Sequence, residues 1–462
     1  MELGIARLTR SVVALTFAGF LVAASLDAGF NGGGGGRNVG GVMIDTAGVV
    51  RTATVEEQQE FVNLMRAGVA GARGDLDKAT DLRMVSLSGL QNAITDVRQK
   101  GGRLPESIQY LAGLTRVEYV FVDEKTNDLV IAGPAEPWTV AADGSIVGTK
   151  TGAAILHLED LVVAIRSVET ARHGGISCSI EPTAEGRQRL HQLIARIKQR
   201  PVQNPAVFEE SMKQAYGPQT IELHGIPADS RYACTMVAAD YEMKRLAMGL
   251  VDAPVKGMPS YIAMSRNAAH SAGQNPRWWM ECNYESLSRN AAGTAWKLSG
   301  QGIKTLTEQD VIAADGTATG SGRKDKLATQ WAEKMTEKYT ELARELPIFG
   351  DMRNLMDLTV VATLIVQENL ESKAGMELSV LRDGKALEPI AYDPPRTIAP
   401  ECSFVKGRAG WVVTASGGVS VNAFEIVAGS VENEAAVAET HSIAMAKKTG
   451  DQKTGEQWWW NR

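Results

Sequence analysis

The sequence predicts an α+β protein made of several small mixed α/β units with β-hairpins. Two patterns carry this prediction. Runs of β-branched and aromatic residues flank short polar or glycine-containing turns, as in β-hairpins. Between these runs lie segments whose apolar residues recur three and four positions apart, the spacing of an amphipathic helix. The 46 glycines of the chain supply turns and joints between such elements.

Length and charge limit the domain count and the partners. The chain has 462 residues, and at roughly 100 to 200 residues per domain it is expected to hold about two to four domains. Its formal net charge of -6 gives the chain as a whole no basic character with which to neutralise phosphates. Nucleic acid is therefore not expected as a partner.

The N-terminal stretch has the features of a secretory signal peptide over residues 1–28. Arg7 and Arg10 precede an apolar run from Ser11 to Leu26, and small residues lie at positions 23 to 28. The run has about 16 residues, fewer than the roughly 20 that cross a bilayer as a helix. We therefore expect cleavage, export to the periplasm or the extracellular space, and no transmembrane segment in the mature chain.

The mature chain is expected to begin with a Gly-rich linker over residues 29–41, because consecutive glycines are costly to order. An N-terminal α+β region follows over residues 42–170. Its predicted elements are hairpins over 42–54, 116–133 and 138–148, and helices over 55–69, 87–97 and 155–168.

A central α/β unit is predicted over residues 171–275. Its predicted elements are a strand over 176–180, a helix capped by Thr183, a helix from Asn204 to Gly217, a strand over 219–224 and a helix that ends at Gly249. Asp229 or Ser230 can cap the last helix. Asp240 and Lys244 lie four residues apart on it, so they face each other. As an exposed ion pair they would contribute roughly 0.3 to 0.5 kcal/mol.

Several segments resemble a known family. They are GIPADSRYACTMVAADYEMKRLAMGL and MPSY in the central unit, followed by PRWWMECNYESL and SGQGIKTLTE. The chain resembles, over about Glu118 to Leu370, a family of exported and mainly planctomycete bacterial proteins that is known only as a domain of unknown function. The resemblance implies export and provides no catalytic residues to carry over.

The remaining chain is predicted to change from strands to helices and back. Residues 276–372 are expected to form aromatic strands followed by a helical hairpin near 326–370, in which residues 347–351 link two antiparallel helices. Residues 373–430 are expected to be a β-rich C-terminal region with a strand over 376–381. Residues 431–462 read as a polar tail that ends in a Trp triplet.

The four cysteines allow two interpretations. Cys178, Cys234, Cys282 and Cys402 are widely spaced, with no C-x-x-C pair and no nearby His, so no zinc site is predicted. In an oxidising compartment they could form two disulfides in one of three connectivities. Alternatively, they are buried thiols that act as small apolar residues. The sequence leaves both interpretations open.

No cofactor and no metal site is predicted. The chain lacks a phosphate-binding loop and a G-x-S-x-G nucleophile turn. Its six histidines form no H-x-H or H-E-x-x-H pair. A catalytic site would therefore have to be assembled from distant segments, and its weak candidates are His224, Asp229, Asp240 and Lys244. Helix capping and ion pairing explain the three charged residues without catalysis, and we favour this interpretation.

Tryptophans are the candidate binding residues. Trp278, Trp279 and Trp296 could present ring faces to a glycan. Neighbours on a strand point to opposite faces, so one of Trp278 and Trp279 is expected to be in the core. The triplet Trp458 to Trp460 is expected to dock on the protein's own core or on a partner, because exposed it would promote aggregation.

Two functional hypotheses follow. The first is an exported binding or scaffold protein of the periplasm or cell envelope, without catalysis, whose partner is an envelope protein or a glycan. The second is a cell-envelope hydrolase or transferase with a site assembled from scattered polar residues. The sequence does not predict the oligomeric state.

Overall fold

The computed structural model describes residues 36–199, 205–267, 276–312, 318–322, 324–388, 390–401, 405–407, 410–412, 416–429, 431–451 and 457–462. These residues belong to one compact unit, Asn31–Arg462. The signal peptide predicted over residues 1–28 lies outside the described residues and stays a prediction.

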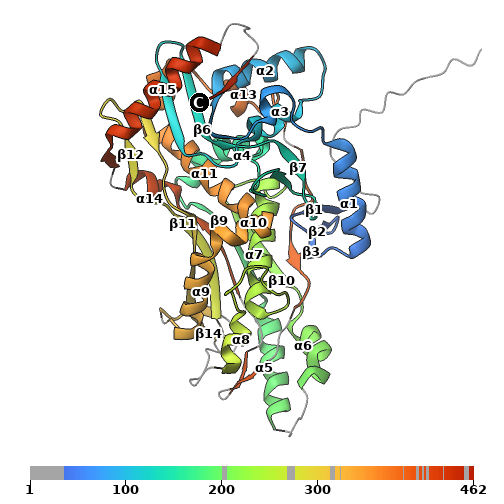
Figure 1. Ribbon diagram of the computed structural model, residues 1–462. Coiled ribbons are helices and arrows are strands. Elements are labelled where there is room, and N and C mark those ends of the chain that lie inside the picture. Colours follow the sequence, from blue (N-terminus) through green and yellow to red (C-terminus); the bar gives the residue numbers. More distant parts are fainter. Residues whose placement is uncertain are drawn as a thin grey trace, which may run out of the picture. The chain divides into compact units, whose positions relative to one another are not determined.

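Helices and strands mix throughout the structure, which confirms the predicted α+β class (Figure 1). The larger sheet has ten strands. In spatial order they are β1 (Gly36–Val39), β2 (Val42–Asp45), β3 (Val49–Thr52), β16 (Thr397–Ile398), β10 (Gln219–His224), β9 (Ile176–Pro182), β19 (Ser416–Val421), β11 (Pro276–Asn283), β14 (Gly302–Ile312) and β15 (Ala318–Gly320). Most neighbours are antiparallel, but β19 runs parallel to β11 and β16 runs parallel to β3.

The second sheet has seven strands. In spatial order they are β20 (Val431–Asn433), β12 (Leu287–Arg289), β13 (Ala295–Lys297), β5 (Tyr119–Asp123), β6 (Asp128–Ala135), β4 (Thr80–Ser86) and β21 (Trp459–Asn461). Two hairpins stand apart, β7 (Trp138–Val140) with β8 (Ile146–Gly148), and β17 (Val405–Gly407) with β18 (Gly410–Val412). Both large sheets therefore take strands from several of the regions predicted along the chain.

The helices are α1 (Val55–Gly68), α2 (Leu87–Gln99), α3 (Glu106–Gln109), α4 (Leu158–Ala171), α5 (Ala184–Lys198), α6 (Glu209–Tyr216), α7 (Arg231–Met248), α8 (Tyr261–Asn267), α9 (Lys326–Glu337), α10 (Tyr339–Glu345), α11 (Pro347–Gln367), α12 (Leu370–Ala374), α13 (Ser379–Arg382), α14 (Ala423–Ala428) and α15 (Ala435–Asp451). Short 3-10 turns are η1 (Gly74–Asp77), η2 (Leu111–Gly113) and η3 (Pro205–Phe208).

Three helices, α4, α7 and α11, pack against one another at the centre of the fold (Figure 1). Helix α7 also contacts β9 and β19 of the larger sheet, while α2 and α12 contact β6 of the smaller one. Helix α11 is buried from Ile348 to Ile365. This matches its nearly all-apolar sequence, because a helix that is apolar on every side must be surrounded by protein.

Local sequence signals explain the boundaries of the central elements. The Thr183 hydroxyl accepts a hydrogen bond from the Gly186 N–H and so caps α5, as predicted. Of the two residues proposed to cap α7, Ser230 does so by accepting from the Ala233 N–H. Gly249 ends α7 with a φ of 63°, a left-handed conformation that glycine adopts without strain.

The structure corrects four local predictions. Residues 36–39, predicted as linker, form β1, because their backbone pairs with β2. The predicted strand over 376–381 gives way to the short helix α13. Residues 347–351 are the first turn of α11 rather than a link, because Pro347 is well suited to a helix start. The tail predicted as polar contains α15, whose alanine-rich sequence favours a helix.

Candidate functional site

The four polar candidates from the sequence separate into an exposed pair and a buried pair. His224 ends β10 and is exposed, and Asp229 is exposed just before the cap of α7. Asp240 and Lys244 are buried within α7. In the described part of the chain, no hydrogen bond or ion pair joins the exposed residues to the buried ones. The structure therefore does not bring the four side chains together.

Asp240 and Lys244 form the ion pair that their spacing predicts, and the pair is buried. Lys244 Nζ lies 2.8 Å from Asp240 Oδ2 and also donates to the Ile180 carbonyl at 3.4 Å. Burial raises the pKa of Asp240, against the lowering effect of Lys244. The pair links α7 to β9, and loss of one partner would leave a charge buried without compensation.

Burial also determines which of the three candidate tryptophans could contact a ligand. Trp278 and Trp296 are completely buried, so they cannot present ring faces to a glycan. Trp278 lies edge-on to Tyr261 and Trp331 and donates from Nε1 to the Ala328 carbonyl at 3.3 Å. Trp279 points to the other face of β11, as the strand alternation predicts, and is half-buried, with Nε1 donating to Glu281 at 2.6 Å.

The Trp triplet docks on the protein's own smaller sheet. Trp459 and Trp460 pair with Val85 and Met84 of β4, and the side chains of Trp458 and Trp460 are buried. Arg83 is completely buried beside them; its guanidinium stacks on Trp459 and donates to Asn461 Oδ1 at 2.8 Å. This is the intramolecular alternative of the two that the sequence allowed.

Three of the four cysteines are buried free thiols. Cys178, Cys234 and Cys282 form no disulfide, and Cys402 lies outside the described residues. Burial raises the pKa of Cys282 to about 12 and raises that of Cys178 as well. A thiol with so high a pKa is a poor nucleophile. The buried-thiol interpretation therefore holds for these three residues.

Sequence reasoning missed a buried charge cluster on the three central helices. We call it the Arg231 cluster, and it consists of Glu159, Asp160, Arg231 and Asp351. Arg231 at the start of α7 forms ion pairs with Asp160 on α4 and, at 2.9 Å, with Asp351 on α11. Its Nε lies 3.8 Å from Glu159. One guanidinium thus joins all three helices.

The outer edge of the cluster is only half-buried. His157 Nδ1 lies 3.9 Å from Glu159, and Tyr392 Oη donates to the same carboxylate at 3.4 Å. At this cluster, the buried atoms His157 Nε2 and Asp160 Oδ1 have no hydrogen-bond partner among the described residues. Burial raises the pKa of Asp160 to about 7 and that of Asp351 to about 6, and it lowers the pKa of His157. The cluster can therefore take up and release a proton near neutral pH.

A second charged group lies further along α11. Asp357 is completely buried and receives hydrogen bonds from Arg116 and from Tyr284 Oη, the latter at 2.6 Å. Arg116 also donates to the Gly300 carbonyl at 3.0 Å. Burial and the Asp357 charge raise the pKa of Tyr284, so it remains a protonated donor. This group connects α11 to the loops before β5 and β14.

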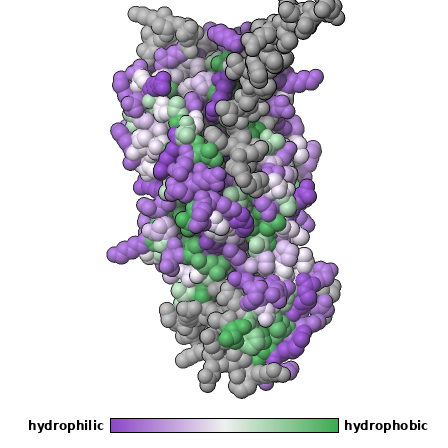
Figure 2. Space-filling model, turned by 90° about the vertical axis from the view of Figure 1, so that its right-hand side faces the viewer, coloured by the Kyte–Doolittle hydropathy of each residue, from purple (hydrophilic) through white to green (hydrophobic). Residues whose placement is uncertain are grey.

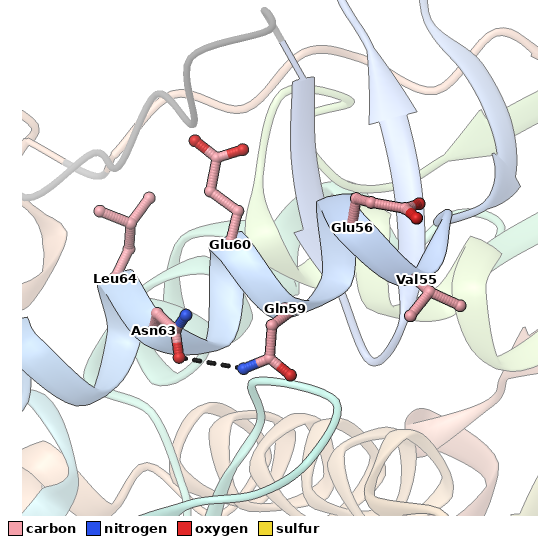
Figure 3. A pocket seen from close by; sticks show the side chains of 6 residues that line it. All are labelled: Val55, Glu56, Gln59, Glu60, Asn63 and Leu64. Atoms are coloured by element: carbon pink, nitrogen blue, oxygen red, sulfur yellow. Dashed lines mark hydrogen bonds between the residues drawn. The ribbon is translucent and has the colours of Figure 1, made fainter.

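A shallow open depression lies along the outer face of α1 (Figure 3). The described residues that line it come from this helix: Val55, Glu56, Gln59, Glu60, Asn63 and Leu64. Their side chains point outward, and Gln59 donates to Asn63 at 3.0 Å (Figure 3). In the part of the chain that the structure describes, no second element lines the depression. We therefore do not assign a site to it.

Family comparison supports part of the resemblance seen in the sequence. Residues 178–261 match the model of a family described as protein of unknown function (DUF1598). The matched segment runs from β9 to the start of α8 and contains Arg231, Asp240 and Lys244. No curated protein and no solved structure showed a significant match to the chain.

In the part of the chain that the structure describes, no helix has the length and apolarity to cross a bilayer. Across the same residues, no three His, Cys, Asp or Glu side chains are grouped as metal ligands.

Proposed function

We propose that the protein is exported and acts in the periplasm or cell envelope as a binding or scaffold protein without catalysis. The main support is that the buried charges of the protein pair with one another. Arg231, Lys244 and Arg116 each pair with a carboxylate in the interior, and together they connect α4, α7, α11 and β9. Charges in such pairs hold helices in place, whereas a catalytic group must reach a substrate.

Export is supported by the arginines and the apolar run before residue 28. The test is to express the full chain in a Gram-negative host, fractionate the cells and measure the intact mass of the product. We expect a periplasmic or envelope product that lacks the first 23 to 28 residues. A Val22→Arg variant should remain uncleaved in the cytoplasm. An uncleaved, cytoplasmic wild-type product would contradict export.

A hydrolase or transferase is the second candidate function. The Arg231 cluster is a better candidate for its catalytic site than the scattered polar residues considered from the sequence. Asp160 has a pKa near 7, and His157 Nε2 and Asp160 Oδ1 are buried without a partner. Groups with these properties can act as an acid or a base. Purified protein should be assayed with ester, peptide and glycan substrates. Turnover that disappears in Asp160→Asn but not in Asp229→Asn would establish catalysis and overturn the binding-protein proposal.

A further inference from the structure

Helices α5 and α6 form a small hairpin with a core of its own. Leu190, Ile197, Met212 and Tyr216 are buried in this core, which is separate from the main core of the protein. Leu193, Ile194 and Phe208 pack against it and are half-buried. Val207, next to Phe208 in η3, is 68% exposed. The hairpin thus presents apolar side chains to solvent beside its own core.

Basic residues border these apolar side chains on both sides. Helix α5 contains four Lys or Arg residues and one Glu, in a chain whose net charge is -6. Arg189 and Arg196 lie seven residues apart, so they share one border of the apolar stripe. Arg187 and His191 lie four residues apart, along the opposite border. Figure 2 shows apolar side chains next to hydrophilic ones at the level at which Figure 1 places α5 and α6.

The arginines keep charge available at the surface. Arg189 and Arg196 are exposed, and Arg189 Nε donates to the Ala215 carbonyl at 3.0 Å. Among the described residues, no acid forms an ion pair with Arg189. Arg187 is half-buried and lies 3.8 Å from Glu181. Helix α6 adds two Glu and one Lys. The positive charge of the hairpin is therefore concentrated along α5.

From this arrangement we infer that the α5–α6 hairpin docks on an anionic lipid bilayer surface. Helices that lie in the plane of a membrane interface combine an apolar stripe with basic residues beside it, since the long basic side chains reach the headgroups while the stripe contacts the acyl region. In the hairpin, Leu190 and Ile197 are buried in its own core. The apolar contact with the bilayer would therefore come from the half-buried Leu193 and Ile194 and from the exposed Val207, and the basic contact from Arg189 and Arg196. The inference goes beyond the proposed function and does not depend on export.

A lipid surface fits these features better than a nucleic acid does. A nucleic-acid site needs basic groups without an apolar stripe, or aromatic rings that stack on bases. Here Leu193 and Ile194 lie beside the basic residues of the same helix, and the net charge of the chain is -6. Because the net charge repels an anionic surface, any binding must come from a local patch.

The test is co-sedimentation with vesicles. Residues 31–462, which form a compact unit of their own, avoid interference from the apolar N-terminal run. We expect binding to vesicles of one part phosphatidylglycerol and two parts phosphatidylcholine, and no binding to pure phosphatidylcholine. Raising NaCl from about 0.05 M to about 0.5 M should abolish most of the binding.

Amino-acid substitutions test whether the α5–α6 hairpin is the surface that binds the vesicles. Arg189→Gln/Arg196→Gln should weaken binding about 25-fold, on the basis of about fivefold for each basic residue near an anionic surface. Val207→Ser should weaken it several-fold, and this variant leaves every charge in place. The matched control is Arg66→Gln/Arg98→Gln, which removes two exposed arginines from α1 and α2 and should leave binding unchanged.

The inference would be overturned by no binding to the anionic vesicles, by equal binding to pure phosphatidylcholine, or by an equal loss of binding in the control pair. Binding to RNA or DNA in the absence of vesicle binding would also overturn it. Thermal unfolding of every variant shows whether a loss of vesicle binding results from the altered surface or from unfolding of the protein.

Discussion

Arg116 donates two hydrogen bonds to Asp357, from Nε and from Nη2, and each is 3.0 Å long. This paired contact joins the chain just before β5 to the middle of α11. Since Asp357 also accepts from Tyr284, one carboxylate neutralises one cation and satisfies one hydroxyl inside the protein.

Replacement of Asp357 with Ala is expected to lower the free energy of unfolding by about 3 to 5 kcal/mol. The physical reason is that Arg116 would keep its charge and Tyr284 its hydroxyl in a buried position without an acceptor. Urea unfolding followed by tryptophan fluorescence measures the change. The double variant Arg116→Met/Asp357→Leu should recover most of the loss. A single variant as stable as wild type would contradict this account.

The Arg231 cluster should make stability depend on pH. Burial raises the folded-state pKa of Asp160 to about 7 and that of Asp351 to about 6, whereas unfolded Asp titrates near 3.9. The folded state therefore holds more protons between about pH 4 and pH 7. The resulting stabilisation is complete below about pH 4 and is lost as the pH rises through 6 and 7.

A comparison with Asp160→Asn isolates this effect, because His157 and the other titrating groups are common to both proteins. The difference in unfolding free energy should shift in favour of the variant, by on the order of 1 to 3 kcal/mol, between pH 5 and pH 8. Chemical unfolding across this range provides the measurement. A pH-independent difference would show that Asp160 is ionised throughout.

Trp460 is expected to anchor the strand β21. Its side chain is 4% exposed, and its Nε1 donates to the Ala444 carbonyl at 3.0 Å. Trp460→Ala should therefore cost about 3 to 5 kcal/mol of stability. Trp459→Ala, at the half-buried neighbour, is the matched control and should cost clearly less. Equal losses of stability in the two variants would contradict the prediction that the more deeply buried ring contributes more.

Gly417 is expected to tolerate no side chain. Its φ is 153°, and an added Cβ would lie 1.5 Å from the Trp278 carbonyl oxygen on the adjacent strand β11. Gly417→Ala should thus disrupt the β11–β19 pairing and cost more than about 4 kcal/mol. Gly384→Ala, where a Cβ meets no atom within 4 Å, should have little effect. Thermal unfolding compares the two variants, and similar melting temperatures would contradict the prediction.

Local signals in the sequence predicted local structure well. Thr183, Ser230 and Gly249 mark helix ends because capping and left-handed backbone depend on single residues and their near neighbours. The strand predicted over residues 219–224 coincides with β10. The prediction over 376–381 was wrong because its alternating apolar residues also fit a short helical turn, a common ambiguity of short apolar runs.

The Arg231 cluster could not be predicted in the same way. Asp160 and Arg231 are separated by 71 positions, and each alone reads as an ordinary residue at a helix start. One signal was present: Asp351 and Asp357 interrupt a helix that is otherwise nearly all apolar. Because an acid inside such a helix must be buried, it requires a cationic partner from elsewhere in the chain.

The position of β19 between β9 and β11 bears on how the chain can be divided and in what order it folds. Most of strand β9 lies in the segment 178–261 that matches the family model, yet one edge of the strand is completed by Ser416–Val421, far later in the chain. During synthesis that edge stays open until β19 has been made. Residues 178–261 produced alone would expose an unpaired strand edge, which favours self-association. Truncated versions for laboratory work should therefore retain the chain through β19.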